Sequence, residues 1–334
     1  MERESTLGRV LWIGLLVVLG GYVISDFASS PFLAPSGSAA IRPTQVTLWI
    51  PAGERDGESG TIVEGAAVAL ELQGHTTSVK SLDGGSSQAV ADFLSRPPHN
   101  GTDLLVVTSS TLAQLARDRR DRLVPGAAEQ AALAGALLHR ATPLNLLASD
   151  RLAIAVAPDS PIQDSEQLIS SMRENPLGQL VAIPDDTWSR VELAALVDRA
   201  GVDGNIRFSV FQSTAEVSRA VDLGAAYTSL GTRGALREGV QSGHLRELDW
   251  PFDGGRAPRF WVALVAAPGL PPTRIAELRS WLHHLRRDAG WRAQLQQAGR
   301  DIGDTGGARL RKLLEHDLVD ANRLELLSQR VERR

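Results

Sequence analysis

Gly, Ser and Thr residues gather in five short segments whose chemistry suits a small anion. The segments cover residues 51–60, 108–111, 184–190, 212–214 and 230–232. Their hydroxyls and backbone amides are hydrogen-bond donors, and Arg190 would add a bidentate contact to a carboxylate. In the alternative interpretation each Ser or Thr only caps the following helix, as Ser213 and Thr214 would do. Taken together, the five segments favour a binding site for a small carboxylate.

The elements that must position these segments are short apolar strands that alternate with longer helical patterns. Strands are predicted at 46–50, 76–82, 103–107, 152–156, 180–183, 206–211, 225–229 and 260–265. Helices are predicted at 60–72, 86–94, 111–119, 165–174, 189–200, 214–222, 272–289, 290–298 and 307–327. This order predicts an α/β fold with two doubly wound lobes and a helical return segment. Because ligands bind at the carboxyl ends of parallel strands, the five segments are expected to meet in one crevice.

The composition is that of a globular protein of about two domains. The 334 residues are 43% hydrophobic and 22% charged, and the net charge is -4. An acidic balance argues against nucleic acid as a partner, because phosphate binding needs a basic surface. The chain has no cysteine, which excludes thiol nucleophiles, iron–sulfur clusters, cysteine zinc sites and disulfides.

The N-terminus carries an apolar run that predicts export. Residues 10–24 are uncharged and follow Arg3 and Arg9, and the next basic residue is Arg42. This asymmetry directs the rest of the chain out of the cytoplasm. Residues 1–28 are interpreted as a membrane anchor or a signal segment that is cleaved, and residues 29–44 as a linker. The expected location is the cell envelope, either anchored to the cytoplasmic membrane or secreted.

The sequence contains no recognisable catalytic constellation, so we predict a protein that is not an enzyme and holds no metal or cofactor. His283 and His284 are adjacent on a predicted helix and point about 100° apart, which prevents them from sharing a metal. Nucleophile-elbow, Walker, dinucleotide-binding and zincin motifs do not occur. The adjacent carboxylates Asp185 and Asp186 leave an exported hydrolase as the least favoured alternative.

Several motifs occur in an order that resembles one receptor family. They are VTLWIPAG at 46–53, LLVVTSST at 104–111, the block 208–229, VQSGHLR at 240–246 and FWVALVAAPGLPP at 260–272. Over about 280 residues their order and spacing resemble the extracytoplasmic solute receptors of bacterial tripartite tricarboxylate transporters, the Bug-type periplasmic binding proteins.

The resemblance implies a two-lobed, Venus-flytrap periplasmic-binding-protein fold, preceded here by the N-terminal hydrophobic helix. Lobe 1 would comprise residues 45–150 plus 262–334, and lobe 2 residues 151–261. Such a receptor captures a small organic anion of the carboxylate type between its lobes and passes it to membrane permease subunits. It would act as a monomer, without nucleic acid and without a catalytic step.

The ligand-binding positions that the resemblance implies lie in four of the loops. They are Pro51, Ala52, Gly53, Thr108, Ser109, Ser110, Thr187, Trp188, Ser189, Arg190, Gln212 and Ser213. The chain departs from the family pattern in the charged run 54–58, which replaces a glycine run, and at Gln212 and Ala226. These departures motivate an alternative function, a membrane-anchored sensor or adaptor with a degenerate pocket.

Overall fold

The computed structural model describes residues 45–96, 101–120, 127–202 and 206–332. The chain divides into two compact units, residues 1–42 and 43–334, and only the second contains described residues. The predicted apolar helix at 10–24 and the linker at 29–44 lie outside them. Among the described residues, no helix has an apolar stretch long enough to cross a membrane.

The first half of the sheet is built on parallel strands. β1 (Gln45–Pro51) pairs in parallel with β2 (Thr76–Leu82) on one side and with β3 (Asp103–Thr108) on the other. The helices that follow these strands are α2 (Ala52–Arg55), α3 (Glu58–Leu72), α4 (Ser86–Ser95), α5 (Ser109–Arg120) and α6 (Ala127–Arg140). Leu48, Ile50 and Val106 are fully buried between these layers, and such burial is the main favourable term for this half.

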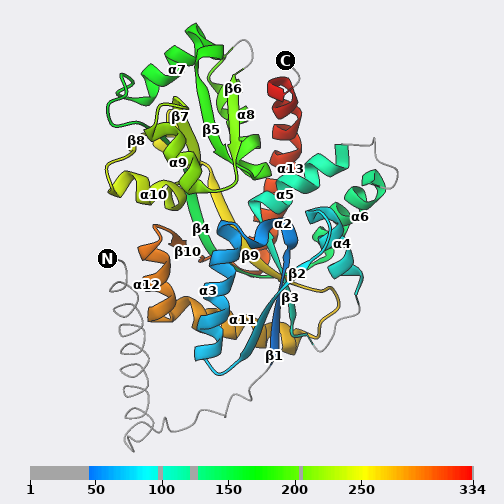
Figure 1. Cartoon of the computed structure of the whole chain (residues 1–334). Coiled ribbons are helices and arrows are strands. Elements are labelled where there is room, and N and C mark those ends of the chain that lie inside the picture. The colour runs from blue at the N-terminus through cyan, green and yellow to red at the C-terminus, as the bar shows by residue number, and fades with distance from the viewer. Residues whose placement is uncertain (1–44, 97–100, 121–126, 203–205, 333–334) are drawn as a thin grey trace, which may run out of the picture. The chain divides into compact units, whose positions relative to one another are not determined.

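Two long strands connect the first half of the sheet to the second (Figure 1). β4 (Thr142–Val156) pairs antiparallel with β9 (Arg259–Ala266) as far as Arg151, and with β7 from Leu152 onward. β9 also pairs antiparallel with β3. β4 is ten residues longer than the predicted strand 152–156. Register shifts at Pro143/Asn145 and Leu146/Ala148 interrupt the alternation of side chains between the two faces of the sheet. The sequence of this part of β4 therefore lacks the two-residue hydrophobic period that identifies a strand.

The second half of the sheet repeats the parallel pattern. β5 (Leu180–Pro184) pairs in parallel with β6 (Arg207–Phe211) and with β7 (Thr228–Thr232). The remaining elements of this half are α7 (Ser165–Glu174), η1 (Pro176–Gly178), α8 (Thr187–Arg199), α9 (Thr214–Asp222), α10 (Arg233–Gln241), β8 (Arg246–Leu248) and η2 (Asp253–Gly255). The predicted strand 225–229 is wrong by three residues, because the Ala226 amide still closes α9 by bonding to Ala220. Residues 230–232 are therefore strand rather than loop.

The C-terminal helices return to both halves. α11 (Pro272–Arg287) and α12 (Ala289–Gln297) pack on α3, and the short strand β10 (Asp301–Ile302) pairs with β4. α13 (Gly307–Glu332) contacts α5 in the first half and α8 in the second (Figure 1). The C-terminal helix is thus a packing partner shared by the two halves.

Candidate functional site

A cavity of about 590 Å³ lies between the two halves at the carboxyl ends of their strands. The first half contributes the α2–α3 region, the turn before α4 and part of α5. The second half contributes the segments that follow β5, β6 and β7. Phe260 of β9 and Arg300 complete the lining. The sequence-based expectation that segments distant along the chain meet at one crevice is thereby realised in the structure.

Seven of the twelve predicted ligand-binding residues line this cavity. They are Gly53, Ser110, Thr187, Trp188, Ser189, Gln212 and Ser213. The other five residues do not belong to the lining. Pro51 and Ala52 form the junction of β1 and α2. Thr108 donates to Glu54, the Ser109 hydroxyl accepts the Trp261 amide at 3.1 Å, and Arg190 donates to Asp185 at 2.8 Å.

The Glu54 carboxylate occupies a cluster of hydroxyl donors in the first half. Thr108 Oγ1 donates to Oε2 at 2.6 Å, and Thr111 Oγ1 donates to Oε1 at 2.7 Å. Ser86 Oγ adds a third bond to Oε1 at 3.3 Å. Burial raises the pKa of Glu54, while the three hydroxyl bonds act in the opposite direction. A carboxylate of the chain itself therefore takes donors that the sequence assigned to a ligand.

A close approach between α2 and α3 sets the position of Glu54. A Cβ at Gly60 would stand only 1.6 Å from the Arg55 carbonyl oxygen. Only glycine therefore lets the short helix α2 fold back on the start of α3. The predicted loop 51–60 is thus mostly helical. Three of its charged residues, Glu54, Asp56 and Glu58, line the cavity, whereas Arg55 pairs with Glu64.

Asp186 is the second carboxylate held by neighbouring donors. It caps α8, accepting the Ser189 amide at 2.7 Å and the Ser189 hydroxyl at 2.6 Å. Ser110 Oγ of α5 donates to it from the other half at 3.4 Å. Burial raises the pKa of Asp186, and its hydrogen bonds to Ser189 act in the opposite direction. This aspartate is a helix cap and a bridge between the halves.

Two further bridges cross the cavity. Thr187 Oγ1 of α8 donates to Gln114 of α5 at 2.8 Å, and Thr232 Oγ1 of β7 donates to Glu58 of α3 at 2.7 Å. Glu58 also receives Arg300 Nε at 3.0 Å. Polar side chains that line the cavity thus link the two halves.

Asp150 lies beside this group at the crossing point of β4. It is buried and accepts the amides of Arg151 at 2.7 Å and Gly234 at 2.8 Å. Burial and the nearby Glu58 raise the pKa of Asp150 to about 7. A Cβ at Gly234 would stand 2.5 Å from its Oδ2, so the glycine permits this contact between α10 and the crossing strand.

Helix capping accounts for part of the hydroxyl chemistry that the sequence displays. Ser213 caps α9 in a capping box with Glu216, and Thr232 caps α10. The helices α3 and α4 differ, because their N-caps are Gly57 and Gly85 and no side chain caps either terminus. Both glycines line the cavity. The positive ends of these two helices therefore face the space in which a ligand would lie.

The sequence indicated only some of the charged residues that line the cavity. Its acidic members are Glu54, Asp56, Glu58, Asp185 and Asp186. Arg300 is the one basic side chain among the described lining residues. The charged run 54–58 marked three of these positions in the sequence. Arg300 carries no such signal, because it follows a C-terminal helix far from every strand end that the sequence identifies.

A smaller cavity of about 220 Å³ lies behind the first, between α5, α8 and α13. Trp188 lines both cavities, and its ring packs against Phe260 at 5.4 Å between centroids. Glu192 faces this rear cavity, where burial raises its pKa to about 7. Asp317 of α13 accepts Trp261 Nε1 at 2.6 Å in the same region. Trp188 therefore separates the front cavity from a buried acidic layer.

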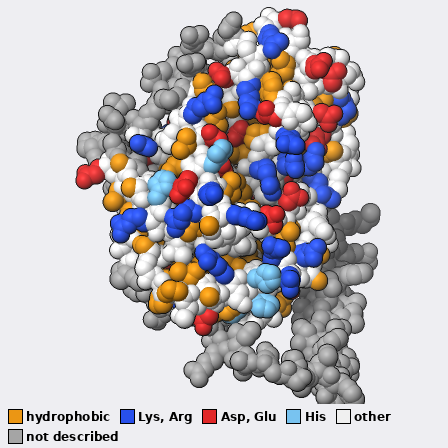
Figure 2. Space-filling model, turned by 180° about the vertical axis from the view of Figure 1, so that it is seen from behind, with side chains coloured by type: hydrophobic (Ala, Val, Ile, Leu, Met, Phe, Trp, Pro, Cys, Tyr) orange, Lys and Arg blue, Asp and Glu red, His pale blue; other side chains and the backbone are white. Residues whose placement is uncertain are grey.

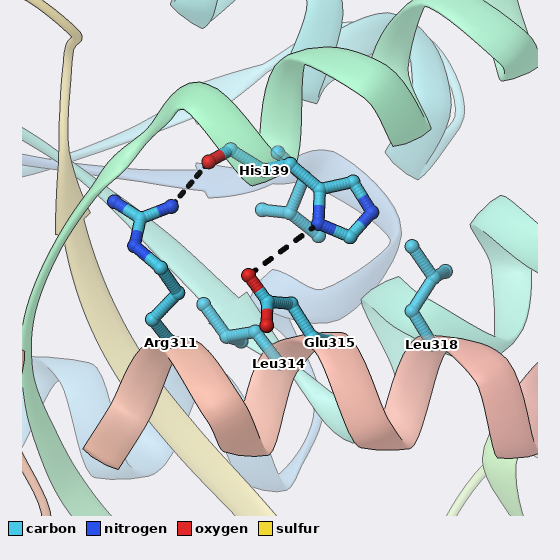
Figure 3. Close-up of a pocket in the computed structure, with 6 residues that line it drawn as sticks. His139, Arg311, Leu314, Glu315 and Leu318 are labelled. Atoms are coloured by element: carbon cyan, nitrogen blue, oxygen red, sulfur yellow. Dashed lines mark hydrogen bonds and ion pairs between the residues drawn. The ribbon is translucent and has the colours of Figure 1, made fainter. Parts of the chain in front are cut away.

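A third hollow, between α6 and α13, is filled by side chains. Near the end of α6, Arg311 donates to the His139 carbonyl and Glu315 pairs with the His139 ring at 3.9 Å (Figure 3). Leu138, Leu314 and Leu318 fill the rest of that hollow, and it has no space for a water molecule.

The face opposite to Figure 1 carries many Lys and Arg side chains (Figure 2).

Comparison with known proteins identifies the fold. No family model and no curated protein matches the sequence. A solved periplasmic transporter is 16% identical, with a TM-score of 0.68, covering 87% of this chain and 99% of its own. MatC from Rhodopseudomonas palustris with bound malate is 15% identical, with a TM-score of 0.65 and coverages of 84% and 99%. The periplasmic binding protein BugD is 14% identical, with a TM-score of 0.64 and coverages of 86% and 98%.

These similarities confirm the predicted fold class, an α/β fold of the two-lobed periplasmic-binding-protein type. Bug-type proteins are among the structural neighbours, in agreement with the sequence resemblance. The helix predicted before the fold and the lobe boundaries 45–150 plus 262–334 and 151–261 stay predictions.

Proposed function

We propose that this chain is an extracytoplasmic solute receptor that binds a small ligand in the cavity between its two halves. One observation carries the proposal. The cavity lies at the carboxyl ends of strands from both halves, and side chains from both line it. Ligand sites occupy this position in open α/β sheets. Such binding requires no covalent step, and the proposed role is that of a receptor.

The ligand would be held by donors and acceptors from both halves at once. Ser110 and Gly53 would contact it from the first half, and Thr187, Ser189 and Gln212 from the second. A ligand that contacts both halves stabilises the closed arrangement over an open one by its differential affinity. The bridges of Asp186 to Ser110 and of Thr187 to Gln114 would support the same closure.

A carboxylate group on the ligand agrees with the family resemblance and with two features of the cavity. The uncapped N-termini of α3 and α4 open on it through Gly57 and Gly85. Free N–H groups and the helix dipole favour a negative group there. Malate is the ligand in one structural neighbour. The receptor would hand its ligand to a permease of the tripartite tricarboxylate type, with residues 10–24 anchoring or exporting the chain.

The test is a thermal-shift screen of the full-length protein. The panel comprises carboxylates, amino-carboxylates and amines, with sugars as neutral controls. A ligand at 100 times its Kd should add about 2.7 kcal/mol to the unfolding free energy and raise Tm by roughly 5 °C. A selective stabilisation within one chemical class supports the receptor. A folded protein whose Tm no member of the panel changes would contradict it.

The alternative is a membrane-anchored sensor or adaptor that works without a solute. Glu54 favours it, because this carboxylate already fills the hydroxyl cluster of Thr108 and Thr111. Co-purification from membranes separates the two functions. A permease subunit as the partner supports the receptor, whereas a signalling protein together with an empty cavity supports the adaptor.

A further inference from the structure

We infer that the ligand of this cavity carries a cationic group. The inference rests on the proposed function, since it specifies the ligand of the same site. The cavity and the fold locate the site, and the charges of the lining define only the chemical class that it accepts. Three observations support the inference: the charge balance, the use of the donors and the aromatic residues.

The lining contains more acidic than basic side chains. Glu54, Asp56, Glu58, Asp185 and Asp186 face the cavity, and Arg300 is the only base among the described lining residues. Arg300 is committed to Glu58 at 3.0 Å, with both side chains largely buried. A cleft lined by one sign of charge concentrates ligands of the opposite sign and repels those of the same sign. A dicarboxylate would therefore be disfavoured at this site.

Many of the side-chain hydrogen-bond donors that a carboxylate ligand would need are already used. Glu54 takes the hydroxyls of Thr108 and Thr111, and Asp186 takes the amide and hydroxyl of Ser189. Asp185 takes the Gln212 amide group at 3.0 Å and Arg190 at 2.8 Å. Each of these carboxylates keeps lone pairs that can accept further bonds. What the cavity offers is mainly acceptors, which match the N–H groups of an amine.

The aromatic residues suit the same ligand. Trp188 and Phe260 line the cavity beside the carboxylates, with their rings tilted by 59°. The face of an indole ring attracts a cation, and the attraction grows when water is excluded. A carboxylate gains nothing from such a face. Carboxylate acceptors beside two aromatic residues in a cavity of about 590 Å³ thus suit a compact organic ammonium group.

Buried carboxylates also link this binding to protons. Burial raises the pKa of Glu54 and of Asp186. A bound cation favours the ionised form of both groups, so binding releases protons, and affinity should increase with pH until both acids are ionised.

The experiment measures the affinity of the full-length protein for matched ligands by titration calorimetry. One triplet is glutarate, 5-aminovalerate and 1,5-diaminopentane, which differ only in their end groups. A second is terephthalate, 4-(aminomethyl)benzoate and 1,4-bis(aminomethyl)benzene. Corresponding triplets of three, four and six carbons vary the length. We expect amine-bearing members to bind at least tenfold more tightly than the dicarboxylate of the same length.

Two variants tie the effect to the cavity. Glu54→Gln keeps the shape and one acceptor oxygen for the hydroxyls but removes the charge, and it should weaken the binding of the amine by about tenfold. Glu71→Gln is the matched control, because Glu71 is an exposed residue of α3 outside the lining, and it should change nothing. Circular dichroism verifies that both variants fold.

The outcomes separate the inference from the proposed function. Binding of a dicarboxylate without its amine counterpart overturns the cationic ligand and leaves the receptor intact. Amine binding that Glu54→Gln does not weaken also overturns the inference, because the charge would lie elsewhere. No binding by any triplet contradicts the receptor itself.

Discussion

At the scale of single residues, Glu54 is the side chain that distinguishes this cavity from one built for an anion. Its carboxylate satisfies Thr108, Thr111 and Ser86. We expect Glu54→Ala to release these hydroxyls and to remove one negative charge. Glutarate should then bind at least tenfold more tightly than it does to the unaltered protein, by calorimetry. An unchanged glutarate affinity, with Glu71→Ala as the control, would show that the hydroxyl cluster is not an anion subsite.

The position of Arg190 in the structure does not match the ligand-binding role that the sequence predicted for it. The sequence favours it as the ligand's charged partner, whereas it pairs with Asp185 and does not line the cavity. We therefore expect Arg190→Ala to change ligand affinity by less than about twofold and stability by about 0.5 kcal/mol, as for other solvent-accessible ion pairs. A tenfold loss of affinity in calorimetry would instead give Arg190 a direct contact with the ligand.

The residue types predicted that several hydroxyl side chains lie near one another, but they did not predict which groups these side chains bond. Ser110, Ser189 and Ser213 lie at the cavity because strand ends converge there. Asp186 caps α8, and Ser109 accepts the amide of Trp261. Both contacts depend on side-chain directions that cannot be read from the spacing of residues in the sequence. The partner of Arg300 is likewise set by tertiary packing, 242 residues away in sequence.

At the scale of elements, the contact between α8 and α13 contains a proton-sensitive group. Glu192 is buried, and its pKa is raised to about 7. The folded state holds a proton that the unfolded state has lost, so this contribution to stability is complete below the ordinary pKa of glutamate. It is lost as pH rises through 7. Wild-type protein should lose about 2 kcal/mol from this group between pH 5 and pH 8.

Glu192→Gln tests this assignment. The variant should lack that part of the pH dependence in urea unfolding followed at pH 5 and pH 8. Glu238→Gln, an exposed residue of α10, is the control and should retain it. A Glu192→Gln variant with the full wild-type slope would place the titrating group elsewhere.

Elements with a clear period were predictable, and elements without one were not. The helices α7 and α9 and the strand β2 have the predicted bounds. The first part of β4 escaped prediction because its register shifts and its polar residues Ser149 and Asp150 break the alternation. These polar groups are tolerated there because Arg259 and Gly234 donate to them. The helix α6 was not assigned, although its Ala and Leu content favours a helix.

At the scale of the whole described unit, the chain combines a two-lobed periplasmic-binding-protein fold with a cavity lined mainly by acidic side chains. The order of strands and helices determines the fold, and the fold is shared with solved neighbours that are only 14–16% identical in sequence. The charge of the cavity depends on a few positions, chiefly the run that contains Glu54 and Glu58. Fold and ligand class are therefore separable properties of this sequence.

The most direct test of this account is a crystal structure of the protein grown with the tightest amine of the triplets. We expect the ammonium group between Glu54 and Asp186, against Trp188, with side chains of both halves in contact with the ligand. A ligand bound outside this cavity, or a carboxylate in place of the ammonium group beside Glu54, would contradict it.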